Sequence, residues 1–172
     1  MSKPDSGHFK GTTGAEKKRI VPGVPGLVTG GNSQKLGRNL MQEMGLPRGT
    51  KWKGYQAQHI IPTELRGHPV LKKIGFDLDD ASNGMFLRRP EKTVSASSRH
   101  YGYHAPYNRF VEKMLDTIDV NSSINSLRKM VQSLQGHLRK MQQSGIVLYP
   151  RQGASVELYE RTYRRLVAQK GK

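Results

Sequence analysis

The sequence predicts an α+β fold in which short strands precede a helix-rich C-terminal part. Two segments, 51–62 and 83–87, combine aromatic and aliphatic residues in short runs bounded by Gly, Asn or Pro, as strands do. From residue 105 onward the apolar residues recur three and four positions apart, which is typical of amphipathic helices. A length of 172 residues suits one domain with a terminal extension.

The composition divides the chain into three parts. Residues 1–32 are rich in glycine, and Pro22 and Pro25 block helix formation there. We therefore expect a flexible Gly/Pro-rich lead-in over 1–32 that partly lies across the domain surface. A core is expected over 33–120, and a C-terminal helical extension over 121–172 that packs on this core.

The core is expected to begin with a helix over residues 32–44. Ser33 is a candidate N-cap, Leu36 and Leu40 share one face, and Gly45 ends the helix. The extended segment 51–62 follows, then a short helix over 63–75. Asn83-Gly84 before an apolar run predicts a tight turn into a strand.

Three helices are expected in the second half. Pro106 is tolerated in a first helical turn, so one helix should begin near Ala105. The next, about 123–143, has an apolar stripe that we expect to pack against the core, with Arg128, Lys129, Arg139 and Lys140 on its other faces. The last helix is expected over about 155–168.

The charge of the chain points to a polyanionic partner. Lys and Arg number 29 against 13 acidic residues, which gives +16 at pH 7 and exceeds the roughly 2–8 charges that keep a small domain soluble. Nucleic acid is the favoured partner, since cations that neutralise phosphates release counterions. An acidic membrane surface or an acidic protein stays an alternative. The candidate phosphate contacts are Arg66, Lys72, Lys73, Arg88, Arg89, Arg99 and Arg109.

Three further features limit the possibilities. The chain has no cysteine, which excludes disulfides and thiolate zinc sites and leaves His, carboxylate, amide or water as metal ligands. No apolar run approaches the roughly 20 residues that span a bilayer. The first ten residues are polar, so any export is expected to occur without a cleaved signal peptide.

Four of the six histidines lie between residues 59 and 104. His59 ends a predicted strand, where a rigid imidazole could serve as a general base, because histidine titrates near neutrality. His100 and His104 are four residues apart, and Asn108 follows after four more. Alternatively, these histidines and the nearby Tyr101, Tyr103 and Tyr107 form an aromatic, partly buried cluster, which spacing alone does not exclude.

Three motifs, in order, resemble the AHH nucleases of the HNH/endonuclease VII superfamily. They are Gln56-Ala57-Gln58-His59-Ile60-Ile61-Pro62, then Asp79-Asp80-Ala81-Ser82-Asn83-Gly84-Met85-Phe86-Leu87, then His100-x3-His104-Ala105-Pro106-Tyr107-Asn108. The resemblance covers roughly residues 50–118. It implies a small ββα-metal (His-Me finger) core with additional packed helices.

The resemblance also implies roles for individual residues. His59 would be the general base, Asn83 would position the hairpin or the base, and His104 would bind metal at a helix start, with Asn108 or His100 completing the set. One position departs from the family, since Gln58 stands where its first His is expected. An amide oxygen suits Mg²⁺ better than it suits softer ions, so Mg²⁺ is favoured, with Mn²⁺, Ni²⁺ and Zn²⁺ as alternatives.

These observations predict a metal-dependent endonuclease that cuts DNA with little sequence preference. The resemblance implies an antibacterial toxin domain, secreted without a cleaved signal peptide and acting in a target bacterial cytoplasm. It also implies an acidic immunity protein that covers the basic cleft in the producing cell. Two alternatives stay open: a nucleic-acid-binding module whose nuclease site has degenerated through Gln58, and an RNA-cleaving toxin with the same core.

Overall fold

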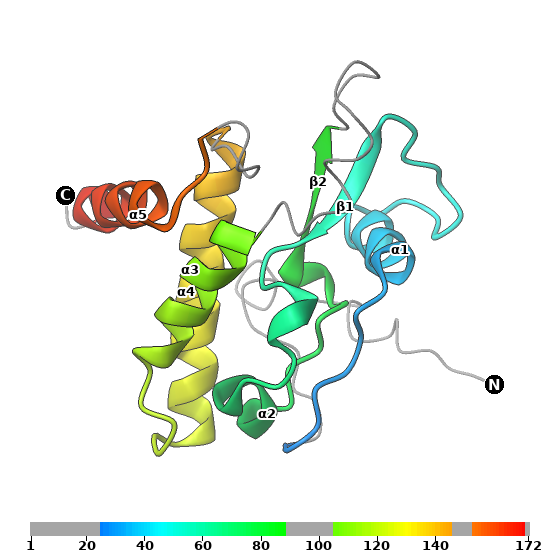
Figure 1. Cartoon of the computed structure of the whole chain (residues 1–172). Helices are drawn as coiled ribbons and strands as arrows, with labels where there is room; N and C mark the ends of the chain where they lie inside the picture. The colour runs from blue at the N-terminus through cyan, green and yellow to red at the C-terminus, as the bar shows by residue number, and fades with distance from the viewer. Residues whose placement is uncertain (1–24, 89–104, 146–152, 171–172) are drawn as a thin grey trace.

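The computed structural model describes residues 25–88, 105–145 and 153–170, and the fold is α+β as predicted. Its sheet is a single antiparallel hairpin of β1 (Tyr55–His59) and β2 (Gly84–Arg88), in which His59 pairs with Gly84. Between the strands run η3 (Thr63–Leu65), α2 (Pro69–Ile74) and η4 (Ala81–Asn83). The hairpin lies beside a group of helices formed by the C-terminal half (Figure 1).

Helix α1 (Ser33–Glu43) covers the hairpin from the other side. Leu36 and Leu40 are buried with Ala81 and pack against the half-buried Ala57 and Phe86. The helix lies where it was expected, but its cap is Asn32 rather than Ser33. The Asn32 Oδ1 accepts hydrogen bonds from the backbone N–H groups of residues 34 and 35, at 2.8 and 3.0 Å. An N-cap lies one residue before the first helical residue, and Ser33 is already that first residue.

The short helix expected over 63–75 is broken into η3 and α2. His68 separates the two, and its Nδ1 accepts from the backbone N–H of Val70 at 3.2 Å, which caps α2. The expectation of one continuous helix was therefore wrong in its middle.

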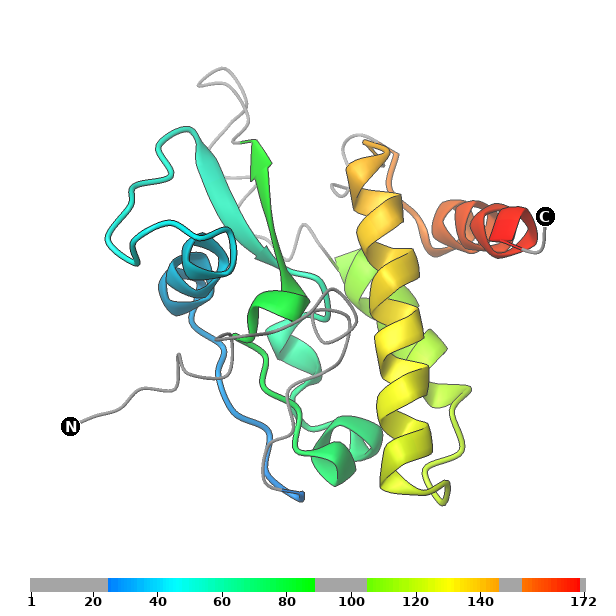
Figure 2. The same ribbon diagram turned by 180° about the vertical axis from the view of Figure 1, so that it is seen from behind.

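The helices α3 (Ala105–Asp116), α4 (Ile124–Gln143) and α5 (Val156–Lys170) begin within a residue of their predicted starts. Helix α3 crosses α4 in both views and is joined to it by the hydrogen bond between Tyr107 and Gln142, and α5 contacts both helices (Figures 1 and 2). The predicted stripe of α4 is buried in the main core, at Leu127, Val131, Leu134, Leu138 and Met141. None of the described helices is both long enough and apolar enough to cross a membrane.

Helix α4 also contributes polar contacts to the hairpin. Arg139 was expected on an outer face, but its guanidinium donates to the backbone carbonyls of Gly84 at 2.8 Å and Ser82 at 2.7 Å. Burial lowers the pKa of Arg139, yet a guanidinium stays charged at neutral pH. These two hydrogen bonds from Arg139 hold the start of β2 against α4. The apolar periodicity of the helix could not predict them, since residues 84 and 139 are 55 positions apart.

Candidate active site

His59 lies at the end of β1 and is held there by its neighbours. The next two residues, Ile60 and Ile61, are fully buried in the core, so the strand end cannot move freely. The His59 side chain is 11% exposed, and its Nε2 lies 2.8 Å from Oδ1 of Asp79, which has no exposed surface. This ion-pair geometry joins two residues that are 20 positions apart.

Asp79 is ionised in the folded protein. Burial acts to raise its pKa, but hydrogen bonds from His59 and from the backbone N–H groups of Gly31 and Asn32 outweigh burial and leave the pKa below its usual value. A carboxylate can only accept hydrogen bonds, so His59 must donate through Nε2–H. The neutral ring then carries its free lone pair on Nδ1, which has no hydrogen-bond partner within the described part of the chain.

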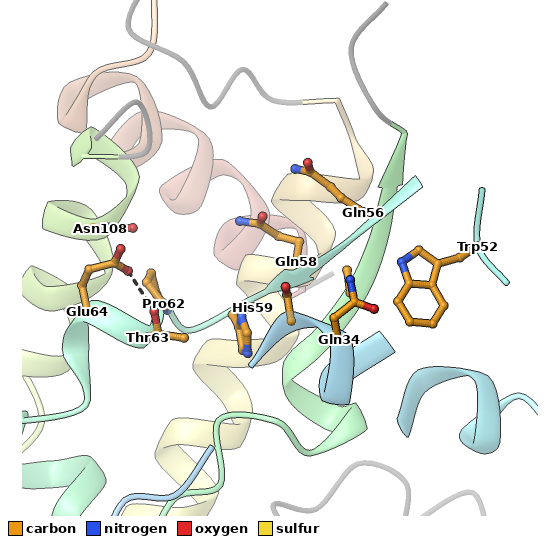
Figure 3. A pocket seen from close by; sticks show the side chains of 11 residues that line it. Gln34, Trp52, Gln56, Gln58, His59, Pro62, Thr63, Glu64 and Asn108 are labelled. Atoms are coloured by element: carbon orange, nitrogen blue, oxygen red, sulfur yellow. Dashed lines mark hydrogen bonds between the residues drawn. The ribbon is translucent and has the colours of Figure 1, made fainter. Parts of the chain in front are cut away.

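A polar pocket of about 330 Å³ opens beside His59 (Figure 3). Gln58 comes from β1, Glu64 from η3 and Asn108 from α3, so three elements converge on it. In Figure 3 the Glu64 side chain points toward helix α3, where Asn108 lies. The remaining lining residues are Ser33, Gln34, Trp52, Gln56, Ala57, Pro62 and Thr63. Seven of the eleven lining side chains offer hydroxyl, amide or carboxylate groups, which suits a polar ligand.

Asn83 is fully buried, and protein groups use both ends of its amide. Its Oδ1 accepts from the Ile61 backbone N–H at 2.8 Å and from Gln135 Nε2 at 3.1 Å. Its Nδ2 donates to the backbone carbonyls of Ile61 at 3.1 Å and Leu78 at 3.0 Å. Asn83 thus ties the segment after His59 to the segment that precedes β2, and it does not line the pocket.

Tyr107 braces the same strand end from α3. Its hydroxyl donates to the carbonyl of Ile60 at 2.7 Å and accepts from Gln142 Nε2 of α4 at 2.7 Å. Burial raises the pKa of Tyr107, so the hydroxyl keeps its proton and remains a donor. The position of His59 is therefore fixed by α3 and α4 as well as by the hairpin.

Several predicted site residues lie outside the described residues. These are His100, His104, Arg89 and Arg99. Within the ranges that the structure describes, no three His, Asp or Glu side chains gather in a way that could hold a metal ion. The oxygen donors that the pocket does offer, on Gln58, Glu64 and Asn108, are of the hard type that Mg²⁺ accepts.

The predicted phosphate contacts within the described residues do not form one patch. Lys72 and Lys73 lie on α2, at the opposite end of the molecule from the tip of β2, where Arg88 lies (Figure 1). The Lys73 ammonium donates to the carbonyls of Val120 and Ser122 at 2.9 and 3.0 Å. Arg109 is exposed on α3, next in sequence to the pocket-lining Asn108, and Arg66 donates to the carbonyl of Gly30.

Asp79 and Glu64 were not among the site residues predicted from the sequence. Asp79 lies in the mostly buried run 76–81, where three aspartates stand among Phe76, Leu78 and Ala81. This mixture indicates that a carboxylate here is buried and paired, but it does not show which of the three, since buried charges are rarely left unpaired. Glu64 gave no comparable signal, because an acidic residue after a Pro-Thr turn is ordinary on a protein surface. Only the packing of η3 near α3 brings it to the pocket.

An antiparallel hairpin followed along the chain by α3, with a histidine at the hairpin's end beside a polar pocket, is the arrangement of a ββα-type nuclease core. Residues 39–144 match the AHH family, described as a nuclease family of the HNH/ENDO VII superfamily with conserved AHH. The match spans more than half of the 172 residues, and the chain belongs to this family. The segment predicted to correspond to the conserved AHH reads Ala57-Gln58-His59 in this chain.

Nucleases of this superfamily act on nucleic acid and generally use divalent metal ions. No curated protein and no solved structure matches the chain.

Proposed function

We propose that the protein is a metal-dependent endonuclease that hydrolyses phosphodiester bonds of DNA, with His59 as the general base. The observation that supports this most strongly is the His59–Asp79 pair. It occupies Nε2 of the ring and, among the residues that the structure describes, leaves Nδ1 without a partner, on a histidine that lines a polar pocket. A general base needs a free lone pair within reach of water, and His59 offers one.

In this mechanism His59 Nδ1 takes a proton from the water that attacks the phosphorus. Asp79 stabilises the imidazolium that results, because its carboxylate is charged and lies 2.8 Å from Nε2. Asn83 acts as a positioning residue, since its amide joins Ile61 to Leu78 and keeps the strand end in place. The contribution of the chain is thus a fixed, correctly protonated base.

A divalent ion would stabilise negative charge on the phosphate and on the leaving oxygen when bound. We propose that His104 binds this ion and that Asn108 or His100 completes the set of metal ligands. Glu64 and Gln58 would supply further oxygen donors. Gln58 favours Mg²⁺ over softer ions, because an amide oxygen is a hard ligand.

The substrate is proposed to be DNA bound without strong sequence preference. The net charge of +16 supports contacts to the phosphate backbone, and Arg109 is the exposed cation beside the pocket-lining Asn108. The resemblance to AHH toxin domains supports a role as a secreted antibacterial effector acting in a target bacterial cytoplasm. An acidic immunity protein would then bind the basic protein in the producing cell.

Supercoiled plasmid incubated with the purified protein and Mg²⁺, with and without chelator, tests the proposal directly. Nicking that requires the ion, and that the His59→Ala protein lacks, is the expected result. Parallel reactions on single-stranded RNA separate a DNase from an RNase. Tight binding of plasmid with no cleavage under any divalent ion would instead indicate a binding module with a degenerate site.

A further inference from the structure

The segment just before α1 lies along the chain that leads to Asp79. The Thr29 backbone N–H donates to the carbonyl of Phe76 at 3.0 Å, and the Thr29 carbonyl accepts from the Leu78 N–H at 2.8 Å. Thr29 and Asp77 form an isolated parallel bridge. The chain then turns through residues 30–32 into α1. This turn lies upstream of residues 39–144, the part that matches the family.

The turn supplies two of the donors that hold the Asp79 carboxylate. The backbone N–H groups of Gly31 and Asn32 lie 2.9 and 3.0 Å from Asp79 Oδ1. The same oxygen accepts from His59 Nε2 at 2.8 Å. Hydrogen bonds to a carboxylate are stronger than neutral ones, so the turn and the histidine together fix the direction in which Oδ1 points.

Glycine is required where the turn approaches Asp79. Gly30 has φ +86°, and a Cβ atom at this position would lie 2.8 Å from both Cγ and the backbone N of Asp79. Asn32 fixes the other side of the turn, because its side chain caps α1. The turn therefore has little freedom, with Asp79 on one side and the first turn of α1 on the other.

We propose that the turn of residues 30–32 is a positioning element of the active site, which orients Asp79 and through it the ring and tautomer of His59. The inference rests on the proposed role of His59 as the base. A carboxylate that accepts from Nε2–H keeps the lone pair on Nδ1, whereas an amide at position 79 could pair with either tautomer. Activity would then depend on a segment that the composition assigns to a flexible lead-in.

Gly30→Ala tests the element, and Gly26→Ala is its matched control. Gly26 has φ +92°, so alanine meets the same backbone restriction there, but nothing lies within 4 Å of the added Cβ. In the full-length chain we measure the single-turnover rate of DNA cleavage per folded molecule, the DNA affinity, and the ¹⁵N shifts of the His59 ring. The shifts report the tautomer whether or not the protein cleaves.

The Gly30→Ala rate should fall roughly ten- to hundredfold with DNA affinity unchanged, because a small misplacement of a catalytic group has effects of this size. The His59 ¹⁵N shifts of the Gly30→Ala protein should also change. The Gly26→Ala protein should match the parental protein in cleavage rate and in these shifts. A folded Gly30→Ala protein with the parental rate and parental shifts would overturn the inference. If the parental protein proves to have no nuclease activity, a change in the His59 ¹⁵N shifts on Gly30→Ala would still support the positioning role. That outcome would reject only the proposed function.

If Gly30→Ala does not fold, Asp79→Asn decides the question. The substitution keeps the size of the side chain and removes its obligatory acceptor character. We expect a loss of about 100-fold or more in rate, by analogy with the aspartate that orients a catalytic histidine in serine proteases. The His59 ring should then no longer hold its proton on Nε2 alone. An Asp79→Asn protein with the parental rate and tautomer would contradict the proposal.

Discussion

Two histidine–aspartate pairs in this chain share one distance and differ in what they leave free. His59 Nε2 lies 2.8 Å from Asp79 Oδ1, and His68 Nε2 lies 2.8 Å from Asp116 Oδ1. The Asp79 side chain has no exposed surface, whereas that of Asp116 is 65% exposed. The ring of His68 also accepts a hydrogen bond from Val70 through Nδ1, while Nδ1 of His59 is free within the described residues.

A histidine–carboxylate contact therefore does not by itself identify a general base. An imidazole with both nitrogens engaged has no lone pair left for water, so His68 serves as the cap of α2. His59 keeps a lone pair and lines a pocket. Asn83 resembles His68 in this respect, because protein groups occupy both ends of its amide. Substitutions at these residues should therefore separate effects on stability from effects on activity.

Asn83→Ala should have the largest effect on stability. The change leaves buried groups of Ile61, Leu78 and Gln135 without partners, and each such group costs about 1–3 kcal/mol. We expect the free energy of unfolding to fall by about 3 kcal/mol or more, measured by urea denaturation. Asn125→Ala, at an exposed position on α4, is the control and should change little. Equal free energies of unfolding for the two variants would contradict the role of Asn83 in holding the strand end in place.

His68→Ala should destabilise the protein moderately and spare its activity. Loss of a helix cap costs about 1 kcal/mol, and the contact to the exposed Asp116 adds little. The cleavage rate per folded molecule should stay at the parental value. A strong loss of rate without loss of stability would mean that the second pair takes part in catalysis.

Gln58→His should tighten the binding of Ni²⁺ and Zn²⁺ relative to Mg²⁺. Imidazole is the better ligand for these ions, and position 58 lines the pocket beside His59. Calorimetric titration of both proteins with each ion measures the change in preference. An unchanged preference would mean that residue 58 takes no part in holding the metal.

Asp79 should give a small pH-dependent contribution to stability. Its pKa is lowered in the folded state, so the carboxylate stabilises the fold above the pKa of an unfolded aspartate, about 3.9. This contribution is lost as the pH falls through the lower, folded-state pKa. The difference in unfolding free energy between the parental protein and Asp79→Asn should therefore be present at pH 7 and shrink below about pH 4. A difference in unfolding free energy that grows below about pH 4 would contradict the lowered pKa of Asp79 in the folded state.

Local patterns predicted most of the fold but not the contacts that orient the site. Pro106 located the start of α3, and the apolar stripe of α4 located its buried face, because both signals act within one helix. The Asp79–His59 pair, the turn at residues 30–32 and the hydrogen bonds from Arg139 join positions 20 to 57 residues apart. Such pairings depend on how α1, α4 and the hairpin pack, which no spacing in the sequence encodes.

The family motifs located His59, Asn83 and Asn108 in the sequence, yet the structure separates them. His59 and Asn108 line the pocket, whereas Asn83 is fully buried and does not line it. Burial of the amide is a property of the packed core, to which Gln135 of α4 contributes. Motif order alone could not distinguish a residue that meets the substrate from one that holds the strand end.

The central claim is that His59, and not its counterpart His68, performs the chemistry. The direct measurement compares single-turnover DNA cleavage in Mg²⁺ by His59→Ala and His68→Ala, each normalised to the folded fraction from thermal melting and to DNA affinity. A general base contributes about 10²–10⁴-fold to rate, so His59→Ala should lose at least 100-fold with its affinity intact, while His68→Ala keeps the parental rate. Cleavage by folded His59→Ala protein at the parental rate would contradict the account.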